Sequence, residues 1–430
     1  MLARWLYTLA FYLATPVLLF RLYQRGRDNP GYRQRVLERF GIYANAPLNA
    51  SLWLHTVSVG EFMAAQPLIR RLLQANHDSP IVITTMTPTG SERVQSTFAP
   101  EIQAGRVAHV YLPYELPAAI NSFLSRFSPR ILVVLETELW PNLIHFTHKR
   151  GIPILIANAR LSAKSARGYQ KVSLLTRPML REISVIAAQS EADGERFIEL
   201  GLPPASLQVT GTVKFDLNVD DELMQQAKAL REQWGGQSRK VFIAASTHEG
   251  EDEQVLEAFR LIHCERPEAL LVLVPRHPER FESAAALLQR HGWKTARFSQ
   301  SQPVTPETSV VLGDVMGQML KLLAAADVAF IGGSLEPVGG HNMLEPLAVG
   351  TPAITGPHVF NFQMVADLLT EQGALTTVTT PLGLGQAVLA LFNDEAARQR
   401  LARQGRAVME QNRGALDRVL FHIQMLLART

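Results

Sequence analysis

The feature that most constrains the fold is a regular alternation of short apolar stretches with amphipathic, helix-like segments. The apolar stretches are β-branched and nearly continuous, and they form two series. The first series lies at 51–58, 81–86, 107–113, 130–136, 153–159, 184–189 and 207–211, and the second at 241–246, 270–275, 310–314, 328–333 and 352–356. Such stretches are typical of parallel strands covered on both faces. The sequence therefore predicts an α/β chain with two doubly wound domains and a cleft between them.

The boundary between these domains is predicted from a polar stretch, "DLNVDDELMQQAKALREQWGGQSRK", that separates the two series. Its glycine pair favours a linker. We expect an N-terminal domain over 26–218, a linker over 219–238, and a C-terminal domain over 239–430. The last helix of the chain can pack back on the N-terminal domain.

The first 25 residues differ from the rest of the chain. Sixteen uncharged residues lie between Arg4 and Arg21, whereas a perpendicular membrane span needs about 20. The charged sequence "LLFRLYQRGR" follows in place of a signal-peptide cleavage site. Its arginines favour a cytoplasmic location for the remaining chain and attract anionic head groups. We predict a membrane anchor over 1–25, spanning or half-inserted; the alternative is a helix packed on the domain.

Several function classes are disfavoured by composition and motifs. A net charge of +3 is too small to argue for nucleic acid, and the one cysteine, Cys264, excludes an intrachain disulfide. Neither a G-x-G-x-x-G after a strand nor a G-x-x-x-x-G-K-[ST] occurs, which argues against a dehydrogenase and a P-loop NTPase. No H-E-x-x-H motif or other histidine cluster with metal-ligand spacing is present.

The strongest motif is "GGSLEPVGGHNMLEP" at 332–346, which ends a strand of the second series. Glycines allow close backbone approach, and Asn342 with the N–H groups of a following helix suits a phosphate. Glu345 suits a ribose diol. Arg276 follows another strand, where its guanidinium fits a phosphate or a base. Met316 and Gly317 follow a third strand and suit a nucleotide slot, although methionine is more often core.

In the first series, Glu61 follows a strand and a glycine turn, and Glu136 and Glu138 follow another strand. Alternation in an extended chain predicts that both later glutamates point the same way. Glu61 is either an acid that opens a helix or a general base. Pro67 suggests that the helix begins nearer Ala65, which leaves Glu61 in the turn and favours the base. Lys214 follows a further strand and can neutralise phosphate charge.

These motifs together resemble the bacterial 3-deoxy-D-manno-octulosonic acid (Kdo) transferases over essentially the whole chain. The motifs are, in order, "SVGE", "TPTG", "LPY", "ETELWPN", "NARLS", "KFD", "AASTHEGE", "LVPRHPERF" and "GGSLEPVGGHNMLEP". The resemblance implies the GT-B glycosyltransferase fold and transfer of Kdo from CMP-Kdo to the lipid A precursor, without a metal or other cofactor. It further implies an enzyme of lipopolysaccharide synthesis at the inner membrane, with its catalytic domains on the cytoplasmic side.

Residue by residue, the resemblance implies that Glu61 is the general base and that Glu138 and Lys214 support the transition state. It assigns CMP binding to Pro275, Arg276, Val315, Met316, Gly317, Asn342, Met343, Leu344 and Glu345. The chain departs from the family pattern at Thr212, where asparagine is common, at Gln318, where glutamate is common, and at Glu115, where aspartate is common.

One base and one electropositive pocket suffice for such a transfer, because a CMP leaving group needs charge stabilisation more than protonation. A single displacement predicts inversion at the anomeric carbon. Two alternatives remain at this point. One is a UDP-sugar transferase or epimerase on the same fold, and the other is a membrane-anchored binder without catalysis.

Overall fold

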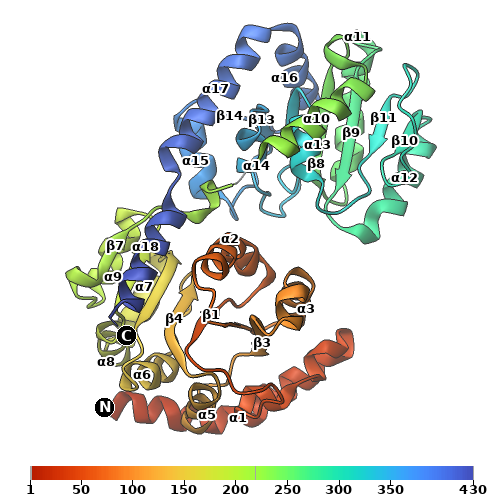
Figure 1. Cartoon of the computed structure of the whole chain (residues 1–430). Helices are drawn as coiled ribbons and strands as arrows, with labels where there is room; N and C mark the ends of the chain where they lie inside the picture. The colour runs from red at the N-terminus through yellow and green to blue at the C-terminus, as the bar shows by residue number, and fades with distance from the viewer. Residues whose placement is uncertain (1, 218, 430) are drawn as a thin grey trace. The chain divides into compact units, whose positions relative to one another are not determined.

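The computed structural model describes residues 2–217 and 219–429, and it divides into two compact units (Figure 1). The first unit comprises the chain up to Asp216 together with the segment from Arg413 onward, and the second comprises Leu217–Asn412. Each unit is built on its own parallel sheet, as the two series of apolar stretches predict.

The sheet of the first unit has seven strands within the described residues, in the order β3-β2-β1-β4-β5-β6-β7. All of its neighbouring strands are parallel. The strands are β1 (Ser51–His55), β2 (Ile81–Thr85), β3 (Val107–Tyr111), β4 (Pro129–Leu135), β5 (Ile154–Ala159), β6 (Val185–Ala188) and β7 (Leu207–Val209). Trp53 contributes to one apolar core, while its neighbours Leu52 and Leu54 contribute to another. This is the alternation expected of a strand covered on both faces.

Helices surround this sheet. They are α1 (Leu2–Asp28), α2 (Val59–Ala75), α3 (Pro88–Thr97), α4 (Ala99–Gln103), α5 (Pro117–Phe127), α6 (Pro141–Lys149), α7 (Ala163–Lys171), α8 (Ser173–Arg181), α9 (Glu191–Glu199) and α18 (Ala415–Leu427). The short 3-10 helices are η1 (Pro30–Arg33), η2 (Val36–Phe40), η3 (Pro204–Ser206) and η4 (Val213–Phe215).

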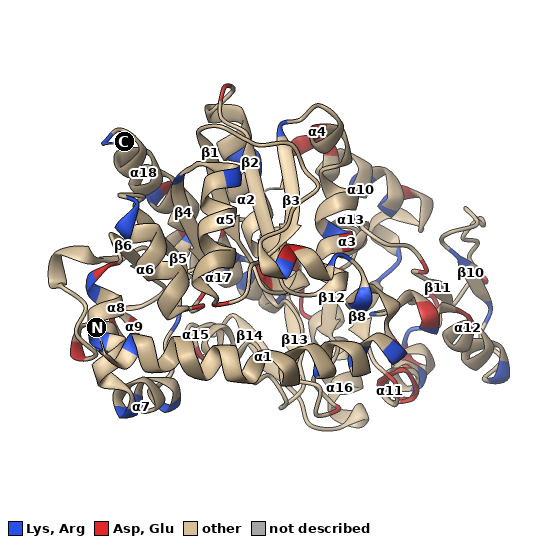
Figure 2. Ribbon diagram, turned by 90° about the horizontal axis from the view of Figure 1, so that it is seen from below, with Lys and Arg blue, Asp and Glu red and all other residues tan. Residues whose placement is uncertain are grey.

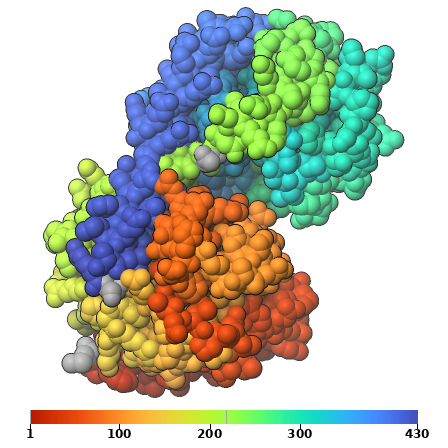
Figure 3. Space-filling view, in the orientation of Figure 1, coloured from red at the N-terminus to blue at the C-terminus, as the bar shows by residue number. Residues whose placement is uncertain are grey.

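Helix α18 (dark blue in Figure 3) comes from the end of the chain and packs on β4 and α2 of the first unit. Leu416, Val419 and Ile423 belong to the same apolar core as Leu52 and Leu54. The carboxylate of Asp216 accepts hydrogen bonds from the N–H groups of Gly414 and Leu416, each at 2.6 Å. A carboxylate at the positive end of a helix is stabilising, so Asp216 fixes the start of α18.

The sheet of the second unit also has seven parallel strands within the described residues, in the order β10-β11-β9-β8-β12-β13-β14. They are β8 (Val241–Thr247), β9 (Leu270–Pro275), β10 (Thr295–Arg297), β11 (Val310–Leu312), β12 (Val328–Ile331), β13 (Ala353–Thr355) and β14 (Leu375–Thr377). The helices are α10 (Asp221–Gln233), α11 (Glu251–Glu265), α12 (Phe281–Arg290), α13 (Met319–Ala324), α14 (Leu344–Ala348), α15 (Gln363–Glu371), α16 (Pro381–Asn393) and α17 (Glu395–Asn412), with η5 (Gly236–Ser238) and η6 (Pro278–Arg280).

The structure differs from the sequence-based prediction over 219–238, where a linker was expected. Most of it forms α10, which packs on α13 and belongs to the second unit. The physical reason is Arg231, whose side chain is buried and donates to Asp327 at 2.7 Å and to the Ala325 carbonyl at 3.0 Å. A buried, paired arginine fastens a helix to its domain, and the polar composition of the stretch concealed this contact.

Helix α1 is long and apolar enough to cross a membrane by length and composition, and only 6% of its most apolar window is buried. Between Arg4 and Arg21 it carries no charged side chain (Figure 2). One face contacts the domain: Phe11 packs against Tyr114 and Leu116, and the helix contacts α6 and α8. The large apolar side chains that stay exposed include Leu2, Trp5, Leu6, Leu9, Leu13, Val17 and Phe20. The helix is therefore partly packed and still presents an apolar surface.

Candidate active site

The predicted residues of the first unit lie just beyond the carboxyl ends of its strands. Parallel sheets bind their ligands at these strand ends. Glu61 follows β1, and Glu136 and Glu138 follow β4, which pairs directly with β1. Lys214 lies in η4, after β7. The two segments that carry these glutamates therefore follow strands that are neighbours in the sheet.

Glu61 lies in the first turn of α2, and the expected helix start near Ala65 is wrong. The helix begins at Val59 because Ser58 caps it: Ser58 Oγ accepts from the N–H of Glu61 at 3.5 Å. Glu61 reaches back in return, with Oε2 accepting from the N–H of Val57 at 2.6 Å and Oε1 from Ser58 Oγ at 3.0 Å. This reciprocal arrangement is a variant of the capping box, in which the acid accepts from the N–H of the residue before the N-cap. It starts the helix upstream of Pro67, which lies inside the helix.

The protonation of Glu61 is set by opposing effects. Burial raises the pKa of its carboxyl, the hydrogen bonds from Val57 and Ser58 lower it, and the nearby charge of Glu136 raises it further. The net direction is upward, so burial outweighs the capping interactions. A carboxylate with a raised pKa is a stronger base than a fully solvated one.

Glu138 is perturbed more strongly. Burial, followed by the charge of Glu61, raises the pKa of Glu138 to about 7, while Trp140 partly opposes this. Glu136 adds a smaller increase. Glu136 itself has φ of 59°, in the left-handed region. The extended alternation from which both glutamates were predicted to point the same way therefore does not apply, because β4 ends at Leu135 and the backbone turns there.

Lys214 belongs to the same electrostatic cluster. Burial lowers the pKa of its ammonium group, Glu136 opposes this, and Arg160 lowers it further. Its 3-10 helix is held by Asn158, whose Oδ1 accepts from the N–H of Val213 at 3.2 Å and whose φ is 55°. A non-glycine residue in this region is uncommon and clusters at functional sites. The structure thus brings Glu61, Glu138 and Lys214 into one cluster, together with Glu136 and Arg160, which sequence reasoning did not assign.

In the second unit, the glycine-rich loop 332–346 is held by a buried glutamate that the sequence did not single out. Glu251 is fully buried, and its carboxylate accepts from the N–H groups of Gly333 at 2.6 Å, Ser334 at 2.8 Å, Leu335 at 2.9 Å and His248 at 2.9 Å. A Cβ on Gly332 would lie 2.5 Å from the carbonyl oxygen of Ser246. Only glycine fits this close approach of two backbones.

Arg276, Asn342 and Glu345 come together beside this loop. Asn342 donates from Nδ2 to Glu345 Oε1 at 3.2 Å, and its Oδ1 accepts from the N–H of Leu344 at 3.1 Å. Burial raises the pKa of Glu345, and the charge of Arg276 acts against this. The helix expected after Asn342 is short, since α14 spans only Leu344–Ala348.

Histidines add to this cluster. The Nε2 atoms of His248 and His341 are 2.7 Å apart, and the planes of the two rings are nearly parallel, at 10°. Burial, followed by the charge of Arg276, lowers the pKa of His341 to about 4. One neutral ring therefore donates to the other at neutral pH.

The remaining predicted CMP residues also lie at the carboxyl ends of strands in the second sheet. Pro275 ends β9, and Val315, Met316 and Gly317 follow β11, its neighbour. Met316 is 58% exposed, so it is not core, and Gly317 has φ of 78°. Met343 and Leu344 are buried and anchor the loop. Within 2–217 and 219–429, no group of three or more His, Cys, Asp or Glu side chains is arranged to hold a metal.

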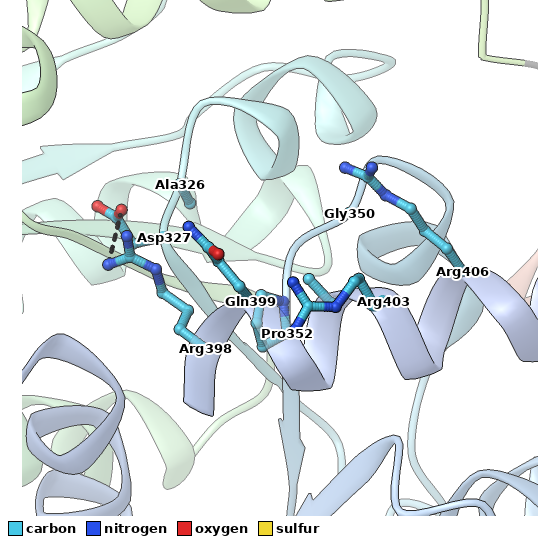
Figure 4. Close-up of a pocket in the computed structure, with 9 residues that line it drawn as sticks. Ala326, Asp327, Gly350, Pro352, Arg398, Gln399, Arg403 and Arg406 are labelled. Atoms are coloured by element: carbon cyan, nitrogen blue, oxygen red, sulfur yellow. Dashed lines mark ion pairs between the residues drawn. The ribbon is translucent and has the colours of Figure 1, made fainter. Parts of the chain in front are cut away.

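A separate cavity of about 330 Å³ lies at the opposite, amino ends of strands in this sheet (Figure 4). Its lining includes Asp327, just before β12, and Pro352, just before β13, with arginines from α17. Arg398 pairs with Asp327 at 3.2 Å, as the dashed line marks. The cavity is at the amino ends of these strands and is not part of the loop cluster.

Comparisons with known proteins define first the class and then the family. Residues 237–408 match the family model "Glycosyl transferases group 1", and residues 34–217 match that of 3-deoxy-D-manno-octulosonic-acid transferase. With two doubly wound parallel-sheet units, the chain is a glycosyltransferase of the GT-B architecture. The 3-deoxy-D-manno-octulosonic acid transferase of Haemophilus influenzae is 44% identical over 429 residues, 99% of each chain. The chain belongs to this family, which confirms the resemblance.

One further relative supports the family, and one solved structure supports the fold. The 3-deoxy-D-manno-octulosonic acid transferase of Bordetella pertussis is 37% identical over 97% of this chain and 98% of its own length. The UDP-GlcNAc 2-epimerase of Neisseria meningitidis, solved bound to UDP-GlcNAc, has a TM-score of 0.57 over 88% of this chain and all of its own. At 15% identity, the epimerase shows the shared fold alone.

Proposed function

We propose that this enzyme transfers Kdo from CMP-Kdo to a hydroxyl group of the lipid A precursor lipid IVA, with inversion and without a metal, in lipopolysaccharide synthesis. The observation that carries the proposal is the pair of perturbed carboxyls, Glu61 and Glu138, at the carboxyl ends of adjacent strands. In this proposal the first unit binds the acceptor and the second binds the CMP-sugar.

Glu61 is the general base. The acceptor oxygen attacks the anomeric carbon of Kdo, its proton passes to the Glu61 carboxylate, and the bond from that carbon to the phosphate oxygen breaks. CMP leaves with the electron pair. Two of the carboxylate's roughly four lone-pair sites serve the capping box, so acceptor sites remain for the proton. Attack opposite the leaving group gives inversion.

Glu138 and Lys214 support the transition state. Kdo itself carries a carboxylate, and CMP leaves as an anion, so negative charge must be balanced as the bond breaks. The partly desolvated ammonium of Lys214 supplies positive charge in a poorly solvated place, where it is worth more than in water. Glu138, with a pKa of about 7, is half protonated near neutral pH and can donate a hydrogen bond in its neutral form.

The CMP moiety binds in the second unit. Arg276 and the N–H groups at Asn342 and Met343 are suited to the phosphate, and the Glu345 carboxyl to the ribose hydroxyls. Pro275 and the segment Val315, Met316 and Gly317 form the apolar and backbone part of the same site. Glu251 holds the glycine loop in place for this purpose.

We further propose that α1 attaches the enzyme to the cytoplasmic face of the inner membrane. The helix exposes a row of large apolar side chains and ends with Arg25 and Arg27. Such a surface fits a bilayer, with the arginines at the head groups. The support is the combination of the exposed face and the partial docking of α1 on the domain, which fits a helix lying along the membrane surface.

The test uses the purified full-length protein with CMP-Kdo and lipid IVA. We expect transfer by the wild type, a loss of roughly 10²–10⁴-fold in kcat for Glu61→Gln and Glu61→Ala, and no loss for Glu92→Gln, an exposed control on α3. The anomeric configuration of the product, read by NMR, tests inversion. Transfer from UDP-sugars but not from CMP-Kdo would contradict the proposed donor, and near-wild-type turnover in both Glu61 variants would remove Glu61 from the mechanism.

A further inference from the structure

Glu115 is a buried carboxyl that the proposed mechanism does not use. It follows β3 and Tyr114, and only 3% of it is exposed. Its Oε2 accepts from the N–H of Asn142 at 2.7 Å, and its Oε1 from the N–H of Leu143 at 2.8 Å. These are N–H groups of the first turn of α6, which have no partner within their own helix. Glu115 therefore caps α6 from a distant part of the chain.

The same helix start is bound by α1. The fully buried Asn142 donates from Nδ2 to Thr8 Oγ1 at 2.9 Å and to the backbone carbonyl of Glu115 at 2.8 Å. Arg4 Nη1 donates to Asn142 Oδ1 at 3.3 Å. Burial, followed by the nearby charge of Glu115, raises the pKa of the Tyr7 hydroxyl, so Tyr7 lies beside this carboxyl. Two side chains of α1, Arg4 and Thr8, thus join the hydrogen-bond network that caps α6, and Tyr7 lies beside it.

Helix α6 begins immediately after the loop that carries Glu136 and Glu138. Helix α6 begins at Pro141, so only Leu139 and Trp140 lie between Glu138 and the helix. The proline ring fixes φ at the first position. A shift of the helix start is therefore passed to Glu138, because only two residues lie between them and one of these, Leu139, is buried in the core.

We propose that Glu115 is a positioning residue for this loop, and that the docked α1 supports the same loop through Thr8, which bonds to Asn142, and through Tyr7, which packs beside Glu115. The helix that faces the membrane is then also a structural support of the acidic cluster. Its side chains divide accordingly: Tyr7 and Thr8 face the domain, while Trp5, Leu6 and Leu9 are exposed. This inference rests on the proposed function for its kinetic test but not for its structural one.

Two variants and their matched controls test the inference in the full-length protein. Tyr7→Phe removes the hydroxyl beside Glu115, and Tyr12→Phe removes a hydroxyl from the same helix at a residue that is 49% exposed. Glu115→Gln removes one of the two acceptor oxygens and presents an N–H₂ group to the helix donors. Glu92→Gln is its exposed control, and Glu115→Asp restores the charge.

We expect Tyr7→Phe and Glu115→Gln to lower kcat by on the order of 10- to 100-fold through misplacement of Glu138. The KM for CMP-Kdo stays unchanged, since the donor residues lie in the second unit, and Glu115→Asp recovers part of kcat. Hydrogen exchange rises at the amides of Asn142 and Leu143 in Glu115→Gln. The control variants keep the wild-type kcat and exchange.

Three outcomes overturn the inference: equal kcat in Tyr7→Phe and Tyr12→Phe, unchanged exchange over 138–148 in Glu115→Gln, or a parallel change of kcat and donor KM. Should Glu115→Gln fail to fold, Tyr7→Phe, which loses a single hydroxyl group, decides the question. A wild type without Kdo transfer would instead refute the proposed function, and amide exchange would still test the support of the loop by Glu115.

Discussion

Ser58 and Glu61 bind each other at the start of α2: Ser58 Oγ accepts from the Glu61 N–H, and Glu61 Oε1 accepts from the Ser58 hydroxyl at 3.0 Å. The proposed base is therefore also a helix-capping acid. The two interpretations that the sequence set against each other describe the same residue. Capping fixes the position of the carboxylate, and burial keeps its pKa above the ordinary value.

The first prediction follows from this pair. Ser58→Ala removes a hydrogen bond that lowers the pKa of Glu61, so the acidic limb of the pH profile of kcat/KM shifts to higher pH. Loss of the cap costs about 1 kcal/mol of stability. Ser190→Ala is the matched control, because Ser190 caps α9 by accepting from the N–H of Asp193 at 3.2 Å. We expect the same stability loss in both variants and a shifted limb only in Ser58→Ala; an unshifted limb contradicts the role of Ser58.

A second prediction concerns Glu138 and the pH dependence of folding. Its folded pKa of about 7 is above the ordinary value, so the native state binds more protons than the unfolded state between about pH 4.5 and 7. Stability contributed by this group is therefore present at low pH and lost as the pH rises through that window. Glu138→Gln should stabilise the protein at pH 8 by about 1–2 kcal/mol, after allowance for solvent screening, and little at pH 5.

Urea unfolding at the two pH values measures this difference. Glu191→Gln, at an exposed position of α9, is the control and should change stability equally at both. A Glu138→Gln variant whose stability relative to the wild type is independent of pH would show that Glu138 is not perturbed in the folded protein.

The sequence predicted the central strands and the site segments because both depend on local composition. Strands such as β1 and β9 are buried on both faces and so are uniformly apolar. The strands it missed, β10 and β14, are three-residue edge strands whose side chains are partly exposed, as in "TAR". Short edge strands have neither the length nor the alternation that marks a strand.

The parts of the site that sequence reasoning missed depend on contacts between distant residues. Glu251 lies 82 residues before Gly333, and Glu115 lies 27 residues before Asn142. In the sequence, each is an ordinary acid near a strand end. The left-handed backbone at Glu136 was equally hidden, because nothing in "ETELWPN" requires a positive φ there. The cap of α2 has the pattern S-x-x-E in the sequence, whereas Pro67 indicates a later helix start.

Glu251 gives a third prediction. Glu251→Gln replaces a carboxylate that accepts from four N–H groups with an amide that has one acceptor oxygen. The glycine loop then has unpaired buried donors, which costs on the order of 2–3 kcal/mol of stability. We expect CMP affinity, measured by calorimetry on folded protein, to fall at least about tenfold. Glu253→Gln, exposed on the same helix, should leave both quantities unchanged. Equal CMP affinity in the two variants would show that Glu251 does not shape the donor site.

The last prediction concerns the exposed face of α1. Leu9 and Leu13 are 57% and 73% exposed. Because neither belongs to the protein core, each can enter a bilayer without loss of core packing. Burying a leucine side chain is worth about 1.5–3 kcal/mol, and a glutamate at the same position also repels anionic head groups. Leu9→Glu and Leu13→Glu should each lower partition into anionic vesicles, measured by flotation, by at least about tenfold, without a change in thermal stability. Leu382→Glu is the control, since Leu382 is 57% exposed on the second unit. Unchanged flotation of both α1 variants would show that this face does not bind the membrane; a drop shared by Leu382→Glu would show only an effect of charge.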